Sequence, residues 1–218
     1  MQEPSPPRRP RTPAASARGA KVEADVSPTD PIDPHARLQE GMGLAIADKG
    51  YSATTIADVV RHARVSKRTF YEYYPDKEAC FLATYQAMSD ELMARVAQAA
   101  ATSQLEDAVE SAVRTYFASL DERRSFVRGF LSEVHAAGPA ALTLRRKIHL
   151  KFATLLRTAV ERARADGADL TSLSPEMSVA LIGGINELVL SAVERGQKGA
   201  LSHLAPTAVT LIHAVIAR

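Results

Sequence analysis

From position 35 onward, apolar residues recur at helical spacing, and no stretch of useful length alternates with the period of two that a half-buried strand shows. Glycines, prolines and capping residues divide this pattern into segments. Helices are predicted over 35–49, 55–63, 66–74 and 76–99, followed by five more whose apolar faces lie within 105–120, 126–134, 148–160, 175–195 and 206–217. The sequence therefore predicts an all-α fold of about nine helices.

The stretch at 55–74 predicts two short helices joined by a tight turn. Thr55 and Asp58 form a capping-box pattern, and Ser66 is an N-cap at which Val65 and Phe70 are spaced to pack as a hydrophobic staple. The rest of the second helix is cationic or hydroxylated, with Lys67, Arg68, Thr69, Tyr71 and Tyr73. Such a helix suits insertion into a DNA major groove, but an ordinary surface helical hairpin fits the spacing as well.

Residues 1–33 differ in composition from everything that follows. Eight of the twelve prolines fall within the first 34 positions, and the segment contains too few apolar residues to offset its ordering entropy, so it is predicted to be disordered. Its first part is basic, which is typical of an arm that touches DNA phosphates or the minor groove and also of a solvated tail. The formal net charge of +2 means that any basic DNA footprint is local.

Several other classes of protein lack support in the sequence. The single cysteine, Cys80, excludes an internal disulfide framework and fits a reducing compartment. The most apolar segment, Val179–Val193, is interrupted by Asn186 and Glu187, and the N-terminus has no apolar signal-peptide core, so no membrane association is expected. The six histidines show no metal-ligand spacing, and the common catalytic motifs are missing, so we expect no metal, no cofactor and no enzymatic activity. An all-helical enzyme with a site assembled from distant residues is the rival interpretation.

The segment ARLQEGMGLAIADKGYSATTIADVVRHARVSKRTFYEYYPDKEACFLATY closely resembles the DNA-binding domain of the TetR family of bacterial transcriptional regulators. The specific parts are KGYSATTIADVV and VSKRTFYEYYPDKEA, and the resemblance covers roughly residues 36–85. It implies a helix–turn–helix domain over 34–80 and a ligand-binding and dimerisation domain over 81–218. It also implies a cytoplasmic, nucleoid-associated repressor that a small-molecule effector releases from a palindromic operator in double-stranded DNA.

Carried over residue by residue, the resemblance implies DNA contacts at Thr55, Ser66, Lys67, Arg68, Thr69, Tyr71, Tyr73 and Lys77. Lys67 and Arg68 are long enough to reach guanine O6 and N7, and Thr69 suits a base edge or a thymine methyl group. The tyrosines and Lys77 are expected on phosphates. Two positions depart from the family pattern: Arg64 stands where the turn usually has glycine, and Ala57 where a basic residue is common.

For the C-terminal domain, the resemblance implies a homodimer in which 175–195 and 206–217 form a four-helix bundle with the partner, where Gly183 and Gly184 allow close approach. The alternative is that these helices complete a monomer core. An apolar or aromatic effector is expected in a cavity whose candidate polar residues are Tyr85, Tyr116, His135, His149 and Asn186. Each of these is individually common as an ordinary core or surface residue. A filled core would instead indicate a ligand-blind DNA-binding or architectural dimer.

Overall fold

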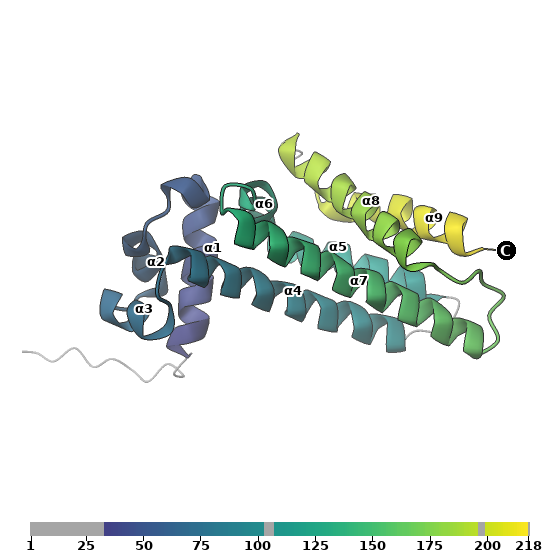
Figure 1. The fold of residues 1–218 in the computed structure, drawn as a ribbon. Helices are drawn as coiled ribbons and strands as arrows, with labels where there is room; N and C mark the ends of the chain where they lie inside the picture. Colours follow the sequence, from purple (N-terminus) through teal and green to yellow (C-terminus); the bar gives the residue numbers. More distant parts are fainter. Residues whose placement is uncertain (1–32, 103–106, 196–198, 218) are drawn as a thin grey trace, which may run out of the picture. The chain divides into compact units, whose positions relative to one another are not determined.

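The computed structural model describes residues 33–102, 107–195 and 199–217, without the side chains at 125, 126, 128 and 132. Within those ranges nine α-helices and one short 3-10 helix are present, and the only pairing of extended backbone is an isolated bridge between Leu170 and Ala217. The predicted all-α fold is confirmed (Figure 1). The arm predicted over 1–33 lies outside the described residues except for Asp33, which caps α1 by accepting from the His35 N–H at 3.0 Å.

The helices follow the predicted order. They are α1 (Pro34–Ala53), α2 (Ile56–Ala63), α3 (Lys67–Tyr73), α4 (Lys77–Thr102), α5 (Ala108–Glu122), α6 (Arg124–Glu133), α7 (Pro139–Ala165), α8 (Pro175–Glu194) and α9 (Ala205–Ile216), with the 3-10 helix η2 (Leu201–Leu204) before α9. The boundary expected between residues 80 and 81 falls inside α4, which runs without a break through one compact unit. The functional division at that point stays a prediction.

Two glycines in α1 explain how the first three helices assemble. Gly50 has φ 77° and ψ 164°, so the helical conformation breaks there and resumes for one short turn. At Gly41 a Cβ atom would lie 2.6 Å from the Val59 carbonyl oxygen and 2.8 Å from the Ala63 amide nitrogen. Only a residue without a side chain at position 41 therefore lets α1 approach α2 this closely.

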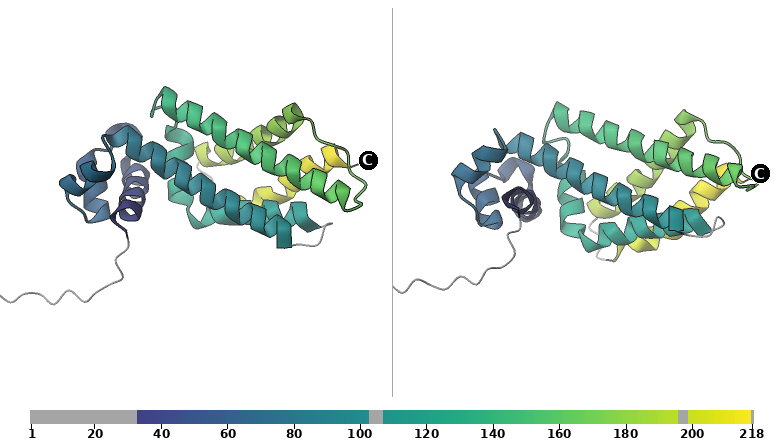
Figure 2. Two further views of the ribbon diagram at one scale, coloured as in Figure 1. Left: turned by 60° about the horizontal axis from the view of Figure 1, so that its bottom comes forward. Right: turned by 90° about the horizontal axis from the view of Figure 1, so that it is seen from below.

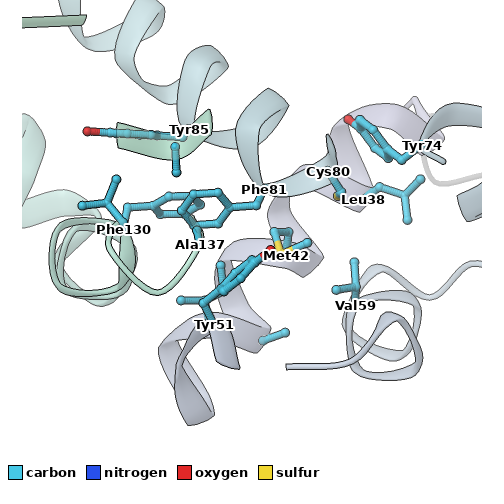
Figure 3. Packing of buried hydrophobic residues seen from close by; sticks show 14 of the residues in the cluster. Leu38, Met42, Tyr51, Val59, Tyr74, Cys80, Phe81, Tyr85, Phe130 and Ala137 are labelled. Carbon is cyan, nitrogen blue, oxygen red and sulfur yellow. The ribbon is translucent and has the colours of Figure 1, made fainter. Parts of the chain in front are cut away.

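An aromatic cluster joins the N-terminal helices to α6. The ring of Phe81 in α4 lies 4.9 Å from the ring of Tyr51 and 4.9 Å from the ring of Phe130, and Tyr85 stacks on Phe130 at 5.6 Å (Figure 3). Phe81 is fully buried and Phe130 is 2% exposed. The cluster thus places side chains of α1, α4 and α6 in direct contact.

A second hydrophobic cluster holds the C-terminal helices together. It draws buried side chains from α5, α6, α7, α8 and α9, and α4 lies alongside both α5 and α7 (Figure 2). The helix α8 has the length and apolar composition of a membrane-spanning segment. Its residues Leu181, Ile185 and Val189 are nevertheless buried in this cluster, as in the central helix of a packed bundle.

Candidate functional site

Helices α2 and α3 are each held at their N-terminus by the predicted cap. The Thr55 hydroxyl accepts from the Asp58 N–H at 3.3 Å, while the Asp58 carboxylate accepts from the Thr55 N–H at 2.9 Å, which completes the capping box. Ser66 Oγ accepts from the Thr69 N–H at 3.0 Å. Hydrogen bonds to Asp58 from Lys49 and Thr55 lower the pKa of the Asp58 carboxyl well below its usual range. These caps fix where the short helices begin.

The turn between α2 and α3 is a left-handed helix cap centred on Arg64. Arg64 has φ 54° and ψ 42°, and it is the one residue other than glycine with positive φ among those described. The Val65 N–H donates to the Val60 carbonyl at 3.1 Å and the Arg64 N–H to the Arg61 carbonyl at 3.3 Å, which is the Schellman pattern. Arg37 Nη2 donates to the Arg64 carbonyl at 2.8 Å, so α1 also supports the turn.

Helix α3 has one buried edge and one exposed edge. Phe70 is fully buried, as the predicted staple requires, and Tyr74, just after the helix, is 5% exposed. On the opposite edge the Arg68 side chain is 90% exposed, Tyr71 is 57% exposed, and Lys67 is also exposed. The cations and the tyrosine expected to contact DNA are therefore solvent-exposed and are not packed into the protein core, which the DNA-binding interpretation requires.

The other predicted DNA contacts differ in their surroundings. Thr55, Ser66 and Thr69 have hydroxyls already engaged in caps: Thr55 Oγ1 donates to Asp58 at 2.6 Å, and the Ser66 and Thr69 hydroxyls lie 2.9 Å apart. Tyr73 is 43% exposed and its ring lies 5.6 Å from the His35 ring. All four lie at the beginning of α2 or on α3, on the same hairpin as Arg68.

Lys77 is placed differently from the other predicted contacts. Its ammonium donates to the Tyr51 and Thr54 carbonyls, both at 2.9 Å, and lies 4.2 Å from the centre of the Tyr51 ring. Burial lowers the pKa of Lys77. The Lys77 side chain thus satisfies two carbonyls at the end of α1. A contact between the third N–H of its ammonium and a DNA phosphate stays a prediction.

A cavity of about 220 Å³ runs among α4, α5, α6, α7 and α8. Most of its lining is aliphatic and aromatic, and four of the five predicted polar residues, Tyr85, Tyr116, His149 and Asn186, belong to it. His135 does not: it is exposed in the turn after α6, beyond the last helical residue Glu133. The structure thus brings four candidates together, and their role in ligand binding stays a prediction.

Burial shifts the pKa values of the cavity's titratable groups in the directions that favour their neutral forms. Burial raises the pKa of Tyr85 to about 12 and also raises the pKa of Tyr116. Burial lowers the pKa of His149, and the nearby Arg145 lowers it further, while a hydrogen bond with Asn186 acts in the opposite direction. A neutral, largely apolar cavity with a few hydrogen-bonding groups is the usual form of a small-molecule site.

Sequence reasoning missed three residues near these sites. Ser89 is buried in the cavity lining and follows Tyr85 by one helical turn, a spacing that was visible in the sequence. Glu133 accepts from the Tyr51 N–H at 3.1 Å, and nothing in the sequence links positions 82 residues apart. Arg145 precedes His149 by one turn of α7, and its Nε is buried.

The surfaces of α8 and α9 bear on the expected dimer. Met177 and Val179 on α8 are 45% and 39% exposed, which leaves apolar surface at the start of that helix. A Cβ on Gly184 would lie 3.5 Å from Leu211 of α9, whereas a Cβ on Gly183 would meet nothing within 4 Å. Gly184 is thus in contact within the chain and Gly183 faces open space. The dimer stays a prediction.

No group of three or more histidine, cysteine, aspartate or glutamate side chains that could hold a metal ion occurs in the part of the chain that the structure describes. Cys80 is buried in the hydrophobic cluster that includes Leu38 and Phe81, and burial raises the pKa of its thiol to about 12. A thiol in this state is a small core residue.

Comparison with known proteins identifies the N-terminal hairpin. Residues 45–84 match the family model of bacterial regulatory proteins of the tetR family. An uncharacterised HTH-type transcriptional regulator, YuxN of Bacillus subtilis (strain 168), is 34% identical over 50 residues, which is 23% of this chain. The match spans only 17% of that relative's length.

Solved structures match over much more of the chain. FadR from Bacillus subtilis, in complex with stearoyl-CoA, has a TM-score of 0.72 at 16% identity and covers 82% of this chain and 97% of its own. A TetR family regulator from Marinobacter aquaeolei VT8 has a TM-score of 0.64 at 22% identity, with 85% and 96% covered. At these identities the likeness shows the fold. Residues 45–84 therefore belong to the tetR family of bacterial regulatory proteins, and the helical fold around them is shared with solved TetR family regulators.

Proposed function

We propose that the protein is a ligand-responsive repressor that reads a palindromic operator through α3 and is released by a small apolar effector. The observation that carries the proposal is the exposed edge of α3, with Arg68 90% exposed and Tyr71 57% exposed opposite the fully buried Phe70. A seven-residue helix cannot bury a core of its own. The exposed cations and phenol of α3, held in place by the buried Phe70, suit a partner that accepts hydrogen bonds and carries negative charge.

Within this proposal the residues of the hairpin have distinct chemical roles. Arg68 and Lys67 read base edges, with arginine the better bidentate partner of guanine. Arg68 Nε donates to Glu72 at 3.2 Å, but both side chains are solvent-exposed. Because exposed ion pairs contribute little stability, release of Arg68 from Glu72 costs little on DNA binding. The pair also orients the guanidinium on the exposed edge before DNA is met.

Phosphate contacts are assigned to the groups around that edge. Tyr71 and Tyr73 present exposed phenols, and Ser66 and Thr55 lie at helix N-termini, where backbone N–H groups favour anions. These contacts position the protein on the duplex and carry no sequence information themselves. Thr69 is the further candidate for a base edge.

The response to ligand follows from the position of α6. Phe130 and Leu131 of α6 line the cavity, and the same Phe130 ring stacks on Phe81 of the N-terminal cluster. Glu133 at the end of α6 accepts from the Tyr51 N–H, where α1 resumes after Gly50. A ligand that moves α6 therefore changes contacts made by α1 and α4, which position α2 and α3.

The operator is proposed to be palindromic because the protein is proposed to bind as a homodimer through 175–195 and 206–217. Exposed Met177 and Val179, together with the open space beside Gly183, provide apolar surface for a second copy of α8. A two-fold symmetric dimer presents two α3 helices to two half-sites.

The protein is also proposed to be cytoplasmic. Its match to bacterial regulatory proteins of the tetR family and the fold that it shares with solved regulators support this location.

The cavity favours the ligand-responsive proposal over a ligand-blind dimer with a filled core. Its volume of about 220 Å³ is below the ~300–1,000 Å³ typical of small-molecule pockets, which favours a slender effector. The lining supports an apolar one. FadR of Bacillus subtilis, which shares the fold, has been solved with stearoyl-CoA, and this supports an apolar chain as the effector class.

The test of the DNA-reading proposal compares two arginines. Arg68→Ala is expected to reduce the preference for the operator over random DNA by about 5- to 150-fold, the worth of one bidentate base contact. Arg114→Ala, which removes a 69% exposed arginine on α5, is the matched control and should leave the preference unchanged. Affinities are measured by fluorescence anisotropy at fixed salt. Equal losses on operator and random DNA for Arg68→Ala would contradict the reading role.

A further inference from the structure

The side chain of Arg145 is an unusual feature of α7. Its Nε is buried and has no hydrogen-bond partner among the described residues. None of the ion pairs in the described part of the chain includes Arg145 either. Burying part of a guanidinium without a partner is costly, and the next arginine along, Arg146, is exposed instead. An anion bound beside Arg145 would remove that cost.

Arg145 lies on α7 one turn before the part of that helix that lines the cavity. It precedes Ile148 and His149 by one turn, and both of these residues line the cavity. Its charge also acts on Tyr85 of α4, another lining residue: the guanidinium opposes the larger effect of burial, which raises the pKa of Tyr85, and adds to the effect of burial, which lowers the pKa of His149. Three groups that can donate hydrogen bonds, from α4 and α7, therefore converge on one region.

The rest of the cavity is long, narrow and apolar. Its lining extends along α4 from Tyr85 to Ala100 and along α7 from Ile148 to Ala163, a length of about 22 Å at the helical rise. Its volume of about 220 Å³ is thus spread along the two helices. Such a slot accepts an unbranched chain more readily than a compact ring system.

We propose that the effector is an unbranched amphiphile, a long-chain carboxylate, whose anionic head group binds Arg145 and His149 while its tail lies along the slot toward Ala163. The inference rests on the ligand-responsive function proposed above and names the chemical class of the ligand. Arginine pairs with a carboxylate through two parallel hydrogen bonds. His149, hydrogen-bonded to the buried Asn186 on α8, supplies a further donor when its free nitrogen carries the proton.

The position of the head group explains how binding reaches the DNA-binding helices. Tyr85 and Ile148 belong to the same hydrophobic cluster as Phe130, Phe81 and Tyr51. An anion held by Arg145 thus sits at the end of the cavity that packs on α6 and α4, where small displacements are passed to α1. A tail without a head group would fill the slot without this contact.

The experiment measures binding to the full chain by isothermal titration calorimetry. The probes are dodecanoate, its methyl ester and its CoA thioester, and the variants are Arg145→Gln with Arg146→Gln as the matched control. Dodecanoate is expected to bind the wild type and to bind Arg145→Gln about 10- to 150-fold more weakly, the worth of charged hydrogen bonds. The methyl ester should bind wild type and Arg145→Gln equally, and Arg146→Gln should behave as the wild type.

Other outcomes separate the inference from the function on which it rests. If the ester binds the wild type as tightly as dodecanoate, the cavity is a ligand site but the anionic-head inference is wrong. The inference would also be overturned if the CoA thioester bound more tightly than dodecanoate and bound Arg145→Gln as tightly as the wild type. If the thioester instead loses affinity in Arg145→Gln, that loss supports an anionic head group supplied by the coenzyme. If no probe binds while operator binding is intact, the chain-ligand class is wrong and DNA reading stands.

Discussion

The left-handed turn at Arg64 yields a prediction in which one substitution stabilises the protein and its close match destabilises it. Arg64→Gly places glycine at φ 54°, ψ 42°, a conformation that costs an L-amino acid roughly 1–2 kcal/mol and costs glycine nothing. Glycine raises the entropy of the unfolded chain, which opposes folding by about 0.4–1 kcal/mol. The net expectation is a free energy of unfolding higher by about 0.5–1 kcal/mol.

The hydrogen bonds of the turn support that estimate. The Arg64 N–H donates to the Arg61 carbonyl, the Val65 N–H donates to the Val60 carbonyl, and the Arg64 carbonyl accepts from Arg37. None of these hydrogen bonds uses the side chain at position 64, so glycine keeps all three. The Arg64 side chain is exposed. The substitution therefore changes backbone strain and little else in the free protein.

Arg61→Gly is the matched control, because the same replacement three residues earlier falls in helical backbone. It is expected to lower the free energy of unfolding by about 1 kcal/mol, since glycine is a poor helix former, with a small addition from the exposed contact to Asp58 at 3.4 Å. Urea denaturation followed by circular dichroism measures both variants. A destabilised Arg64→Gly would refute the account of the turn, as would equal effects at the two positions.

Two further substitutions test the cluster and the cavity. Phe130→Ala should lower the free energy of unfolding by about 3–5 kcal/mol, whereas the exposed Leu142→Ala should change it by less than about 0.5 kcal/mol; equal losses in urea denaturation would contradict the packing described for α6. Burial lowers the pKa of His149 below its ordinary 6.5, so near that pH the folded state binds fewer protons than the unfolded chain does. The contribution of neutral His149 to the free energy of unfolding is therefore present above pH 6.5 and is lost as the pH falls below that value. Thermal melts from pH 7.5 to 5 should therefore show a smaller loss of stability for His149→Gln than for wild type, with the exposed His213→Gln resembling wild type, and parallel curves for all three would exclude His149 as the cause.

Features set by neighbours in the chain could be predicted from the sequence. The caps at Thr55 and Ser66 each depend on a few consecutive residues, whose side chains compete for the same backbone groups. The two edges of α3 were predicted for the same reason, because Val65 and Phe70 fix which side of the helix faces the protein.

Features set by distant segments could not be predicted in this way. Lys77 was expected to contact a DNA phosphate, and its hydrogen bonds to the Tyr51 and Thr54 carbonyls, which tertiary packing brings to its ammonium, were not predicted. The sequence also gave no basis for separating His149 from His135, because the end of α6 at Glu133 depends on how that helix packs against α1. The partial burial of Arg145 has the same origin.

The most direct test of the central claim is the selection of bound sequences from random duplex DNA by the full chain. The account predicts an enriched palindrome with two half-sites separated by about one or more helical turns, as two copies of α3 in a two-fold dimer require. It also predicts that Arg68→Ala relaxes the enriched sequence at one base pair in each half-site. The claim that α3 reads DNA would be contradicted if the wild type enriched no sequence. It would also be contradicted if the wild type and Arg68→Ala enriched the same sequence.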